Sequence, residues 1–462
     1  MNDRYLELNC DIYLNDERFD ENGNPSGGDG VVYSWQKPIK ATANFNGKNH
    51  TIYGLYINWQ ETSAMSMFGS VYVAKNFKML DFYVKSIKII APVCSYCYVE
   101  VSNVTTRGYA SSGSYTSGMI SGAREGALIK DCKSWTTVFG GSQAGGISEA
   151  SGQAEYVNCI NYGDVYGSWA MGGIIGYIGT YLEIKFINCK NYGNFYGLSN
   201  NIASGGIVGM SYGKNSNITM ISCANYGKNE VDGGIIGLLE GNINLIGCKN
   251  YGTLVDDPAS GELISNLRAR KANTIVNIID CEVRSQSGKP IVGNLYYGAD
   301  NLPIEINMKN IIADYSNSTI APSYFLVRAF GSLSDYAKIN VDGVEIIDKR
   351  NDTNKKYLVH QLSETTEVNI KNLLLNIDYE EFNLIPFGSM KPSNELNLSS
   401  VVVCSKQNGA SKNFYFGSDF SGYYVDFKTG KIGLKSMNGK GFFQGTVTED
   451  VLKAKGFTKK TL

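Results

Sequence analysis

The sequence has few prolines, which are common in linkers between domains, and few histidines, which most often transfer protons in enzymes. Only 9 prolines and 2 histidines occur among its 462 residues, and no proline-, serine- or charge-rich stretch divides the chain. A chain of this length exceeds the size at which one globular core stops growing, so it forms several domains or one fold that grows in one dimension. Because no linker is present, the second arrangement is favoured.

Neither sign of charge is in excess. The 42 basic and 43 acidic residues give a formal net charge of −1. Nucleic acids and anionic membranes attract proteins with a basic excess, so neither is expected as a partner. No apolar run approaches the ~18 residues that cross a bilayer, so membrane insertion is not expected. The first residues also lack the basic and apolar regions of a signal peptide, which indicates a trimmed mature segment or an unsecreted protein.

Glycine is abundant, and it accompanies a repeat. The 52 glycines are spread along the whole chain, and a hexad with apolar residues at positions 1, 3 and 6 recurs every 22 to 34 residues. Alternation with a period of two residues indicates a strand with one buried face. The thirteen copies begin at His50, Phe77, Val99, Ala127, Ala154, Ile184, Ile218, Ile243, Val276, Ile306, Ile339, Val368 and Leu396.

Two further motifs recur in step with the hexad. A glycine pair precedes it, at Gly145, Gly172, Gly205 and Gly233, and indicates a second short strand at a tight corner. The triplet Asn-Tyr-Gly follows it, at Asn161, Asn191, Asn225 and Asn250. In stacked coils, equivalent asparagines lie ~4.8 Å apart and can hydrogen-bond along a ladder, while the glycine takes the positive φ of the turn.

These motifs predict an all-β fold, a right-handed parallel β-helix of about thirteen coils. Solenoids need covered ends because an open coil invites aggregation. We expect an N-terminal cap at residues 1–49, the β-helix at 50–416 and a C-terminal cap at 417–462. Within the last cap, YYVDFKT and GKIGLKS indicate a hairpin, and TEDVLKAKGF a short helix.

The chain resembles the bacterial surface β-helix proteins with GLUG-type repeats. The resemblance rests on NFNGKNHTIYGLYI at 44–57, SMFGSV at 66–71 and the repeated GGIIG and CxNYG motifs, and it is clear from residue 50 to about 300. It implies an adhesin-like protein that is extracellular or attached to the cell wall. Some of these proteins carry a metalloprotease domain, but the HExxH motif of that domain is absent from the sequence.

Cysteine is used as a core residue in this repeat. Later coils have Ile311, Val344, Leu373 and Val401 at the same hexad position 6. This exchange with aliphatic residues predicts buried thiols. Disulfides and metal binding are the alternatives. The cysteines concerned are Cys132, Cys159, Cys189, Cys223, Cys248 and Cys281. Cys94 and Cys97 form a CxxC without the βαβ context of a redox motif or a second pair for zinc.

No catalytic constellation emerges from the sequence. His50 and His360 lie far apart in the repeat, and neither stands beside a nucleophile motif. A polysaccharide hydrolase would need two carboxyls on adjacent coils. Asp131 and Asp280 occupy hexad position 5, but the intervening coils have Asn, Ser or Gly there. We therefore expect a protein that is not an enzyme.

Two sets of residues are candidates for binding. The tyrosines after the ladder asparagines could offer flat faces to a sugar or a protein, or could stiffen the corner by stacking. They are Tyr162, Tyr192, Tyr226 and Tyr251. In the loop FDENGNPSGGDG, Asp20, Asn22, Asn24 and Asp29 have the spacing and oxygen chemistry of a calcium site, although a polar cap loop explains them without a cofactor.

The sequence thus favours a non-enzymatic surface protein. It would bind a host glycan or surface protein through its ribbed face or through the loops at 198–217 and 253–270. One alternative is a polysaccharide-degrading β-helix hydrolase or lyase, which a cleft lined by acids from adjacent coils would indicate. Another is a component of a phage tail spike, which a stable trimer would indicate.

Overall fold

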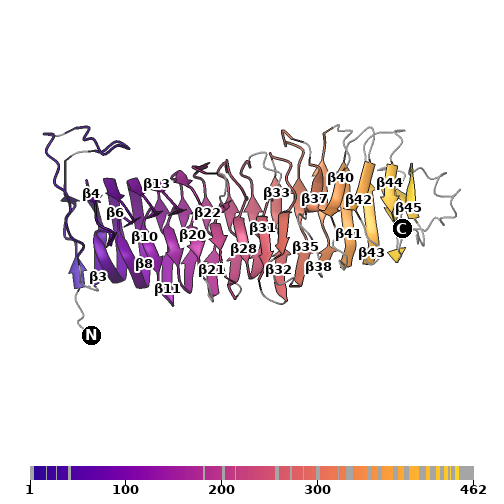
Figure 1. Ribbon diagram of the computed structural model, residues 1–462, viewed down its shortest axis with the longest axis horizontal. Coiled ribbons are helices and arrows are strands. Elements are labelled where there is room, and N and C mark those ends of the chain that lie inside the picture. Colours follow the sequence, from indigo (N-terminus) through magenta and orange to yellow (C-terminus); the bar gives the residue numbers. More distant parts are fainter. Residues whose placement is uncertain are drawn as a thin grey trace. The chain divides into compact units, whose positions relative to one another are not determined.

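The computed structural model is all-β in the residues that it describes (Figure 1). These residues are 5–446, of which 376–446 are described as strand backbone only. The gaps are 17, 28, 40–42, 180–182, 200–202, 214, 255–259, 271–272, 285, 298–301, 321, 329–336, 351–355, 362–366, 378–382, 390–394, 405–412, 417–422, 427–430, 435–436 and 439–442. None of the described segments is a helix that is long and apolar enough to cross a membrane.

The chain forms two compact units, Met1–Leu239 and Glu240–Leu462. Both contain parallel strands that pair from one coil to the next, which confirms the parallel β-helix. The solenoid has about 10 turns, slightly fewer than the thirteen predicted. The predicted boundaries at residues 49 and 416 remain predictions, and TEDVLKAKGF lies outside the described residues.

From Ala127 to Ser211 of unit 1, each coil contributes a hexad strand, two short strands after it and two strands before the next hexad, whereas the earlier hexad strands are longer and span several of these segments. The hexad strands are β3 (Ala43–Tyr53), β6 (Phe68–Ser86), β8 (Cys94–Ser112), β11 (Ala127–Lys130), β16 (Ala154–Val157), β21 (Glu183–Ile187) and β26 (Asn217–Ile221). The strands after them are β12 (Lys133–Ser134), β17 (Ile160–Asn161), β22 (Lys190–Asn191) and β27 (Ala224–Asn225), then β4 (Tyr56–Trp59), β13 (Thr137–Gly140), β18 (Val165–Gly167) and β23 (Phe195–Gly197).

The glycine pairs lie where a small six-stranded sheet meets the strands that lead to the next hexad. The small sheet comprises β5 (Ala64–Met65), β7 (Ile89–Ile90), β9 (Tyr115–Ser117), β14 (Gln143–Gly145), β19 (Ala170–Gly172) and β24 (Ala203–Gly205). The leading strands are β10 (Ile120–Ala123), β15 (Ser148–Ser151), β20 (Ile175–Ile178), β25 (Val208–Ser211) and β28 (Ile236–Glu240), while β1 (Tyr5–Glu7) and β2 (Ile12–Tyr13) pair with β3.

Unit 2 has the same plan with fewer strands in a coil. Its hexad strands are β29 (Asn242–Ile246), β32 (Thr274–Ile279), β35 (Ile304–Lys309), β38 (Ala337–Asp342), β41 (Glu367–Ile377) and β43 (Glu395–Cys404). The others are β30 (Lys249–Asn250), β33 (Glu282–Arg284), β36 (Ile312–Asp314) and β39 (Glu345–Asp348), then β31 (Ile264–Ala269), β34 (Val292–Tyr297), β37 (Tyr324–Val327), β40 (Lys356–Gln361), β42 (Asn383–Ser389) and β44 (Asn413–Phe416).

The C-terminal strands of unit 2 change to antiparallel pairing. Here β45 (Tyr423–Asp426) and β46 (Lys431–Leu434) form a hairpin, and β46 also runs antiparallel to β43. Two further strands, β47 (Met437–Asn438) and β48 (Phe443–Thr446), pair antiparallel with β43 and β44. These antiparallel pairs do not continue the parallel stacking of the preceding coils.

The predicted register holds for the hexads from Val99 on but was wrong for the first two. Within unit 1, Val101 pairs with Ile129, and Ile129 with Tyr156, as the hexads require. Phe77, however, pairs with Val104, which is position 6 of its hexad and not position 1. The frames assigned at His50 and Phe77 are therefore shifted by five residues. Apolar alternation continues on both sides of the turn residue Asn76, so the pattern alone could not choose between the two frames.

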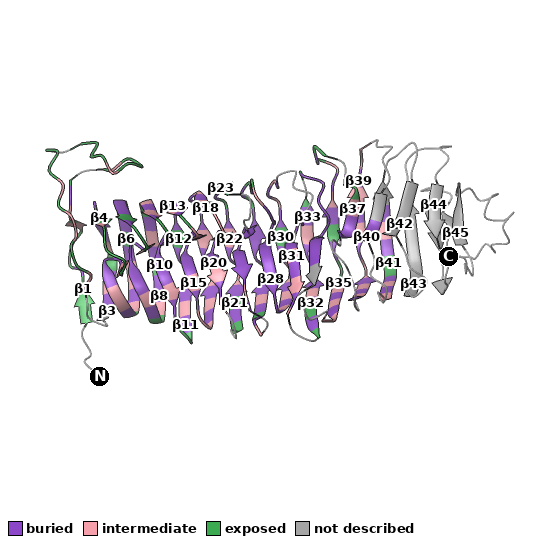
Figure 2. Ribbon diagram, in the orientation of Figure 1, coloured by how far each residue is buried: buried purple, intermediate pink, exposed green. Residues whose placement is uncertain are grey.

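The buried residues of both units, coloured purple in Figure 2, are mostly apolar. The six position-6 cysteines are buried and unbridged, and their thiols donate to backbone carbonyls, as from Cys159 Sγ to Ile129 O at 3.3 Å. The prediction of core thiols is confirmed. Cys94 and Cys97 are also buried and unbridged, and burial raises the pKa of Cys97 to about 12. A thiol held protonated in this way is a poor nucleophile, which argues against redox chemistry at the CxxC.

The predicted asparagine ladder is present in unit 1. Asn161 Nδ2 donates to Asn191 Oδ1 at 2.9 Å, and Asn191 Nδ2 donates to Asn225 Oδ1 at 2.9 Å, with all three residues buried. Asn191 Nδ2 also donates to Gly193 O at 2.8 Å, which closes the turn. Each amide thus satisfies its neighbour in a place that water does not reach.

The glycine of the Asn-Tyr-Gly triplet has a different role from the one predicted. Among described residues, positive φ angles do not include Gly163, Gly193 or Gly227. A Cβ on Gly193 would instead lie 1.9 Å from Gly163 O of the preceding coil. Glycine is required here because successive coils approach closely, and not because of the turn's φ angle.

Positive φ occurs at hexad position 5 instead. Asp131, Asn158 and Asn188 have φ angles of 55°, 53° and 51°, and Ser222 and Asp280 adopt similar values. Asn, Asp and Gly tolerate this left-handed conformation better than other residues, which explains the polar residue at this position. The side chains form a second, exposed ladder, in which Asn158 Nδ2 donates to Asp131 Oδ1 at 2.9 Å.

A third ladder in unit 2 was not predicted. Asn at hexad position 2 recurs from Asn244 to Asn369, with amide-to-amide distances of 2.8, 2.9, 2.7 and 2.8 Å. The sequence contained the signal, because the six hexads from Ile243 to Leu396 share this residue, and the first five of them have described side chains. The members are Asn244, Asn277, Asn307, Asn340 and Asn369.

Replacing one buried ladder amide tests its contribution to stability. We expect Asn191→Ala to lower the free energy of unfolding by roughly 2–4 kcal/mol, because three buried hydrogen bonds are lost. Asn188→Gly is the control: it removes one exposed hydrogen bond at a position that glycine tolerates, and it should cost less than about 0.5 kcal/mol. Urea denaturation followed by circular dichroism measures both, and equal losses would contradict the role of the buried ladder.

Candidate ligand-binding face

Three of the four predicted tyrosines form one continuous stack on unit 1. The ring centroids of Tyr162 and Tyr192 lie 5.1 Å apart, and those of Tyr192 and Tyr226 lie 4.7 Å apart, with interplanar angles of 9° and 4°. They follow strands β17, β22 and β27, whose parallel register places each ring over the next. The stacking alternative is therefore confirmed for these three residues.

The stack has a fourth member that the sequence analysis missed. Trp135 follows β12 as Tyr162 follows β17, and their rings are 4.4 Å apart and nearly parallel, at 9°. The signal was present in the spacing, since Trp135 stands three residues after the position-6 Cys132, as Tyr162 does after Cys159. The coil of Trp135 has Ser-Trp-Thr in place of Asn-Tyr-Gly, which hid the equivalence.

Tyr251 belongs to unit 2 and has a different environment. The guanidinium of Arg284 lies 5.2 Å from its ring centroid, and Lys249 Nζ lies at 5.9 Å. These contacts are cation–π interactions with cations of its own and the next coil.

Stacking decides which ring face can meet a ligand. The faces of Tyr162 and Tyr192 are covered by the rings on either side, so only their edges are accessible. Trp135 has the same exposed fraction as the interior Tyr192, 41%, but among the described residues no ring stacks on the face that it turns away from Tyr162. This end of the stack offers a flat aromatic surface to a ligand.

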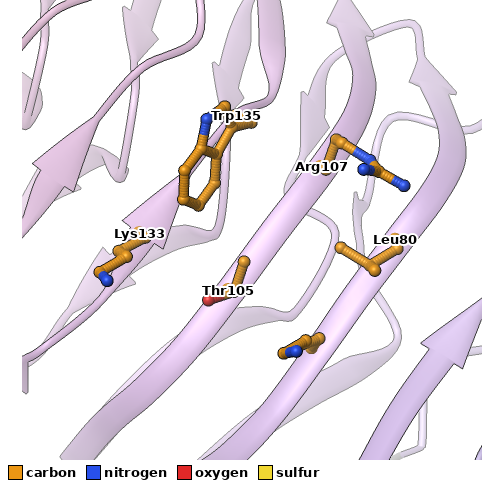
Figure 3. A pocket seen from close by; sticks show the side chains of 6 residues that line it. Leu80, Thr105, Arg107, Lys133 and Trp135 are labelled. Carbon is orange, nitrogen blue, oxygen red and sulfur yellow. The ribbon is translucent and has the colours of Figure 1, made fainter.

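A hollow of about 340 Å³ lies beside Trp135 (Figure 3). Its walls come from neighbouring coils, and the residues point outward because they alternate with buried Met79, Thr106 and Ser134. Where the aromatic stack would continue, the preceding coils have Arg107 and Leu80, which pair with each other in the register of β6 and β8. The lining residues are Lys78, Leu80, Thr105, Arg107, Lys133 and Trp135.

The hollow is basic. Arg107 Nη2 lies 2.8 Å from Asp81 Oδ1, which offsets one positive charge. In the described part of the chain, no carboxylate lies within 4.0 Å of the ammonium group of Lys78 or Lys133. The combination of an open aromatic face with unpaired cations suits a ligand that has an apolar face and an anionic group.

A second aromatic ladder runs four residues after the first and was not predicted. Its centroid distances range from 4.0 to 5.7 Å. The rings are mostly half-buried, and burial raises the pKa of Tyr83 to about 12. Phe19 of the N-terminal loop packs on the first ring at 5.1 Å. The members are Tyr56, Tyr83, Tyr109, Phe139, Tyr166 and Tyr196.

The predicted calcium loop is closed by its own hydrogen bonds. Asp20 Oδ1 accepts the backbone N–H groups of Asn22 and Asn24, both at 2.8 Å, and Asp20 Oδ2 accepts Asn24 Nδ2 at 3.0 Å. These bonds, that from the Asn24 side chain first, lower the pKa of Asp20. Asp29 accepts the N–H of Val31 at 2.9 Å in a separate turn. The loop therefore brings Asp20, Asn22 and Asn24 together without needing a metal.

The acids and the described histidine do not form a catalytic pair. Asp131 and Asp280 accept hydrogen bonds from Asn158 and Asn310 in the exposed turn ladder, both at 2.9 Å. His50 Nδ1 lies 3.3 Å from Asp11 Oδ1, and the side chain of His360 lies outside the described residues. No cluster of three or more potential metal ligands occurs within the described residues.

Glu149 is an unusual buried acid in β15. Burial raises its pKa to about 7, although Ser121 Oγ donates to Glu149 Oε2 at 3.3 Å. Its side chain is closed off from solvent, and other coils have glycine at this position, as at Gly176. Glu149 is therefore a buried acid whose side chain accepts a hydrogen bond from Ser121.

The comparisons add no relative. No family model, no curated protein and no solved structure matches the chain. The resemblance to the GLUG-type surface proteins thus remains a prediction that rests on sequence motifs.

The loop hydrogen bonds predict the behaviour of Asp20 variants. Asp20→Ala removes the three bonds that close the loop, so we expect faster proteolytic cleavage between Arg18 and Val31, with calcium and with a chelator alike. Asp29→Ala, which removes one bond in a separate turn, should change cleavage less. If calcium protected the wild-type loop and neither variant, the metal-free account would be wrong.

The buried Glu149 predicts a pH dependence of stability. Because its pKa rises from 4.5 to about 7 on folding, the folded protein holds a proton that the unfolded chain releases. The contribution of Glu149 to the free energy of unfolding is then fully present below pH 4.5. It falls by on the order of 3 kcal/mol as the pH rises to about 7. Glu149→Gln should remove this fall, whereas Glu155→Gln on the exposed face of β16 should keep it. Urea denaturation across this pH range gives the comparison, and a parallel fall in all three proteins would contradict the assignment.

Proposed function

We propose that this protein is a non-enzymatic, adhesin-like binding scaffold that recognises a glycan at the hollow beside Trp135. The observation that carries the proposal is the hollow beside Trp135, at the end of the stack where no described ring covers the indole. Sugar rings have apolar faces that pack on flat aromatic surfaces, and polar edges that need hydrogen-bond donors. Arg107, Lys133 and Thr105 supply such donors around the hollow.

The scaffold itself supports binding over catalysis. The described carboxylates near this face are engaged: Asp81 pairs with Arg107, and Asp131 accepts Asn158. A hydrolase would need two free carboxyls across a sugar. Stacked coils also hold the lining residues on strands, so the hollow is preorganised and little ordering is needed on binding.

The proposed setting is the outside of a cell, as in the GLUG-type proteins that the sequence resembles. A β-solenoid serves adhesins, enzymes and tail spikes alike, so the setting is drawn from the motifs and not from the fold. We favour a host glycan over a host protein as the ligand because the hollow suits a sugar ring.

The test combines glycan binding with a search for product. We expect the purified protein to bind glycans on an array without releasing reducing ends, and Trp135→Ala to weaken binding by about tenfold or more, equivalent to ~1.4 kcal/mol. Tyr192→Ala is the matched control, because it removes an interior ring of the same stack and should lower stability while preserving affinity.

Two results would contradict this proposal. New reducing ends that appear in the same wells would favour the hydrolase or lyase. Equal loss of affinity in the Trp135 and Tyr192 variants would mean that the stack matters only for folding and that the hollow is not the site.

A further inference from the structure

A row of lysines runs beside the aromatic stack on unit 1. In the strand register, Lys78 pairs with Thr105 and Thr105 pairs with Lys133. Lys133 in turn pairs with Ile160, and Ile160 pairs with Lys190. The lysines therefore stand on every second coil, with Thr105 and Ile160 between them.

Among the described residues this lysine row has no carboxylate partners, in contrast to Lys130 of β11 and Lys185 of β21. Lys130 Nζ lies 3.6 Å from Glu100 Oε1, and Lys185 Nζ lies 3.5 Å from Glu155 Oε1. Within the described residues, no carboxylate lies within 4.0 Å of the ammonium groups of Lys78, Lys133 or Lys190. Carboxylates therefore offset the charges of Lys130 and Lys185, whereas the row beside the stack keeps its positive charge.

The spacing of the row defines the ligand that it fits. Neighbouring strands lie ~4.8 Å apart, so charges on every second coil recur at ~10 Å. Two extended pyranose rings span about this length. Thr105 is uncharged and Ile160 is apolar, so the positions between the lysines offer no partner to an additional acidic group.

We propose that the lysine row and Trp135 bind a linear polysaccharide that carries one acidic group on every second sugar and lies along the stacking direction of the coils. The inference deepens the proposed function and rests on it. Carboxylates or sulfate esters pair with Lys78, Lys133 and Lys190, and the sugar between the first two acidic groups lies in the hollow beside Trp135. Such charge-assisted contacts set register and specificity and weaken as salt rises.

The experiment uses the full chain and four matched oligosaccharides in a binding titration. The first alternates glucuronate with a neutral N-acetylhexosamine, and the second is its carboxyl-reduced, neutral form. The third is the reduced form with one sulfate ester on every second sugar. The fourth is an oligogalacturonate of equal length, with a carboxylate on every sugar.

We expect the first or the third probe to bind about tenfold more tightly than the neutral form. Its affinity should fall as the salt concentration rises. Tighter binding of the first probe identifies a carboxylate ligand, and tighter binding of the third identifies a sulfate ester. The triple variant Lys78→Gln, Lys133→Gln, Lys190→Gln should lose this preference. The control Lys130→Gln, Lys185→Gln, Lys228→Gln changes the net charge equally at paired lysines and should keep it. The salt titration of the unaltered protein provides a readout that does not depend on the folding of any variant.

The outcomes separate this inference from the proposed function. Equal, Trp135-dependent affinity for the neutral and alternating probes would overturn the acidic ligand and leave glycan binding intact. Tighter binding of the oligogalacturonate would overturn the spacing argument. Absence of binding to all four probes, and to every glycan on the array, would overturn the proposed function itself.

Discussion

Parallel pairing between successive coils places each residue over its counterpart at ~4.8 Å, and the other features of this protein depend on that distance. At this spacing one asparagine amide reaches the next, so Asn161, Asn191 and Asn225 satisfy each other where no water enters. Aromatic rings meet at their stacking distance for the same reason. The spacing is also too short for a Cβ where the chain of one coil lies against the carbonyl of the next, which explains glycine at Gly193.

The same geometry makes a solenoid face informative about ligands. A substitution in one coil interrupts the row of equivalent residues, and on unit 1 two neighbouring rows are interrupted in this way. The aromatic row ends at Trp135, and the neighbouring row alternates lysine with uncharged residues. A net charge of −1 gives no hint of this row, because it sums the basic and acidic residues of the whole chain.

The sequence predicted the fold and most of the register because apolar alternation is a local pattern that core burial enforces. It misplaced the frames at His50 and Phe77, since alternation on both sides of Asn76 looks the same from either frame. It offered stacking of Tyr162, Tyr192 and Tyr226 as one alternative but missed Trp135, whose coil lacks the Asn-Tyr-Gly motif. The hollow could not be predicted, because it depends on side chains from neighbouring coils and on which ring face stays uncovered.

The most direct test of the account is a crystal structure of the protein with the alternating uronate oligosaccharide bound. We expect a sugar in the hollow beside Trp135, with successive carboxylates near Lys78, Lys133 and Lys190. A ligand found elsewhere on the chain, with the hollow beside Trp135 filled by solvent, would contradict it.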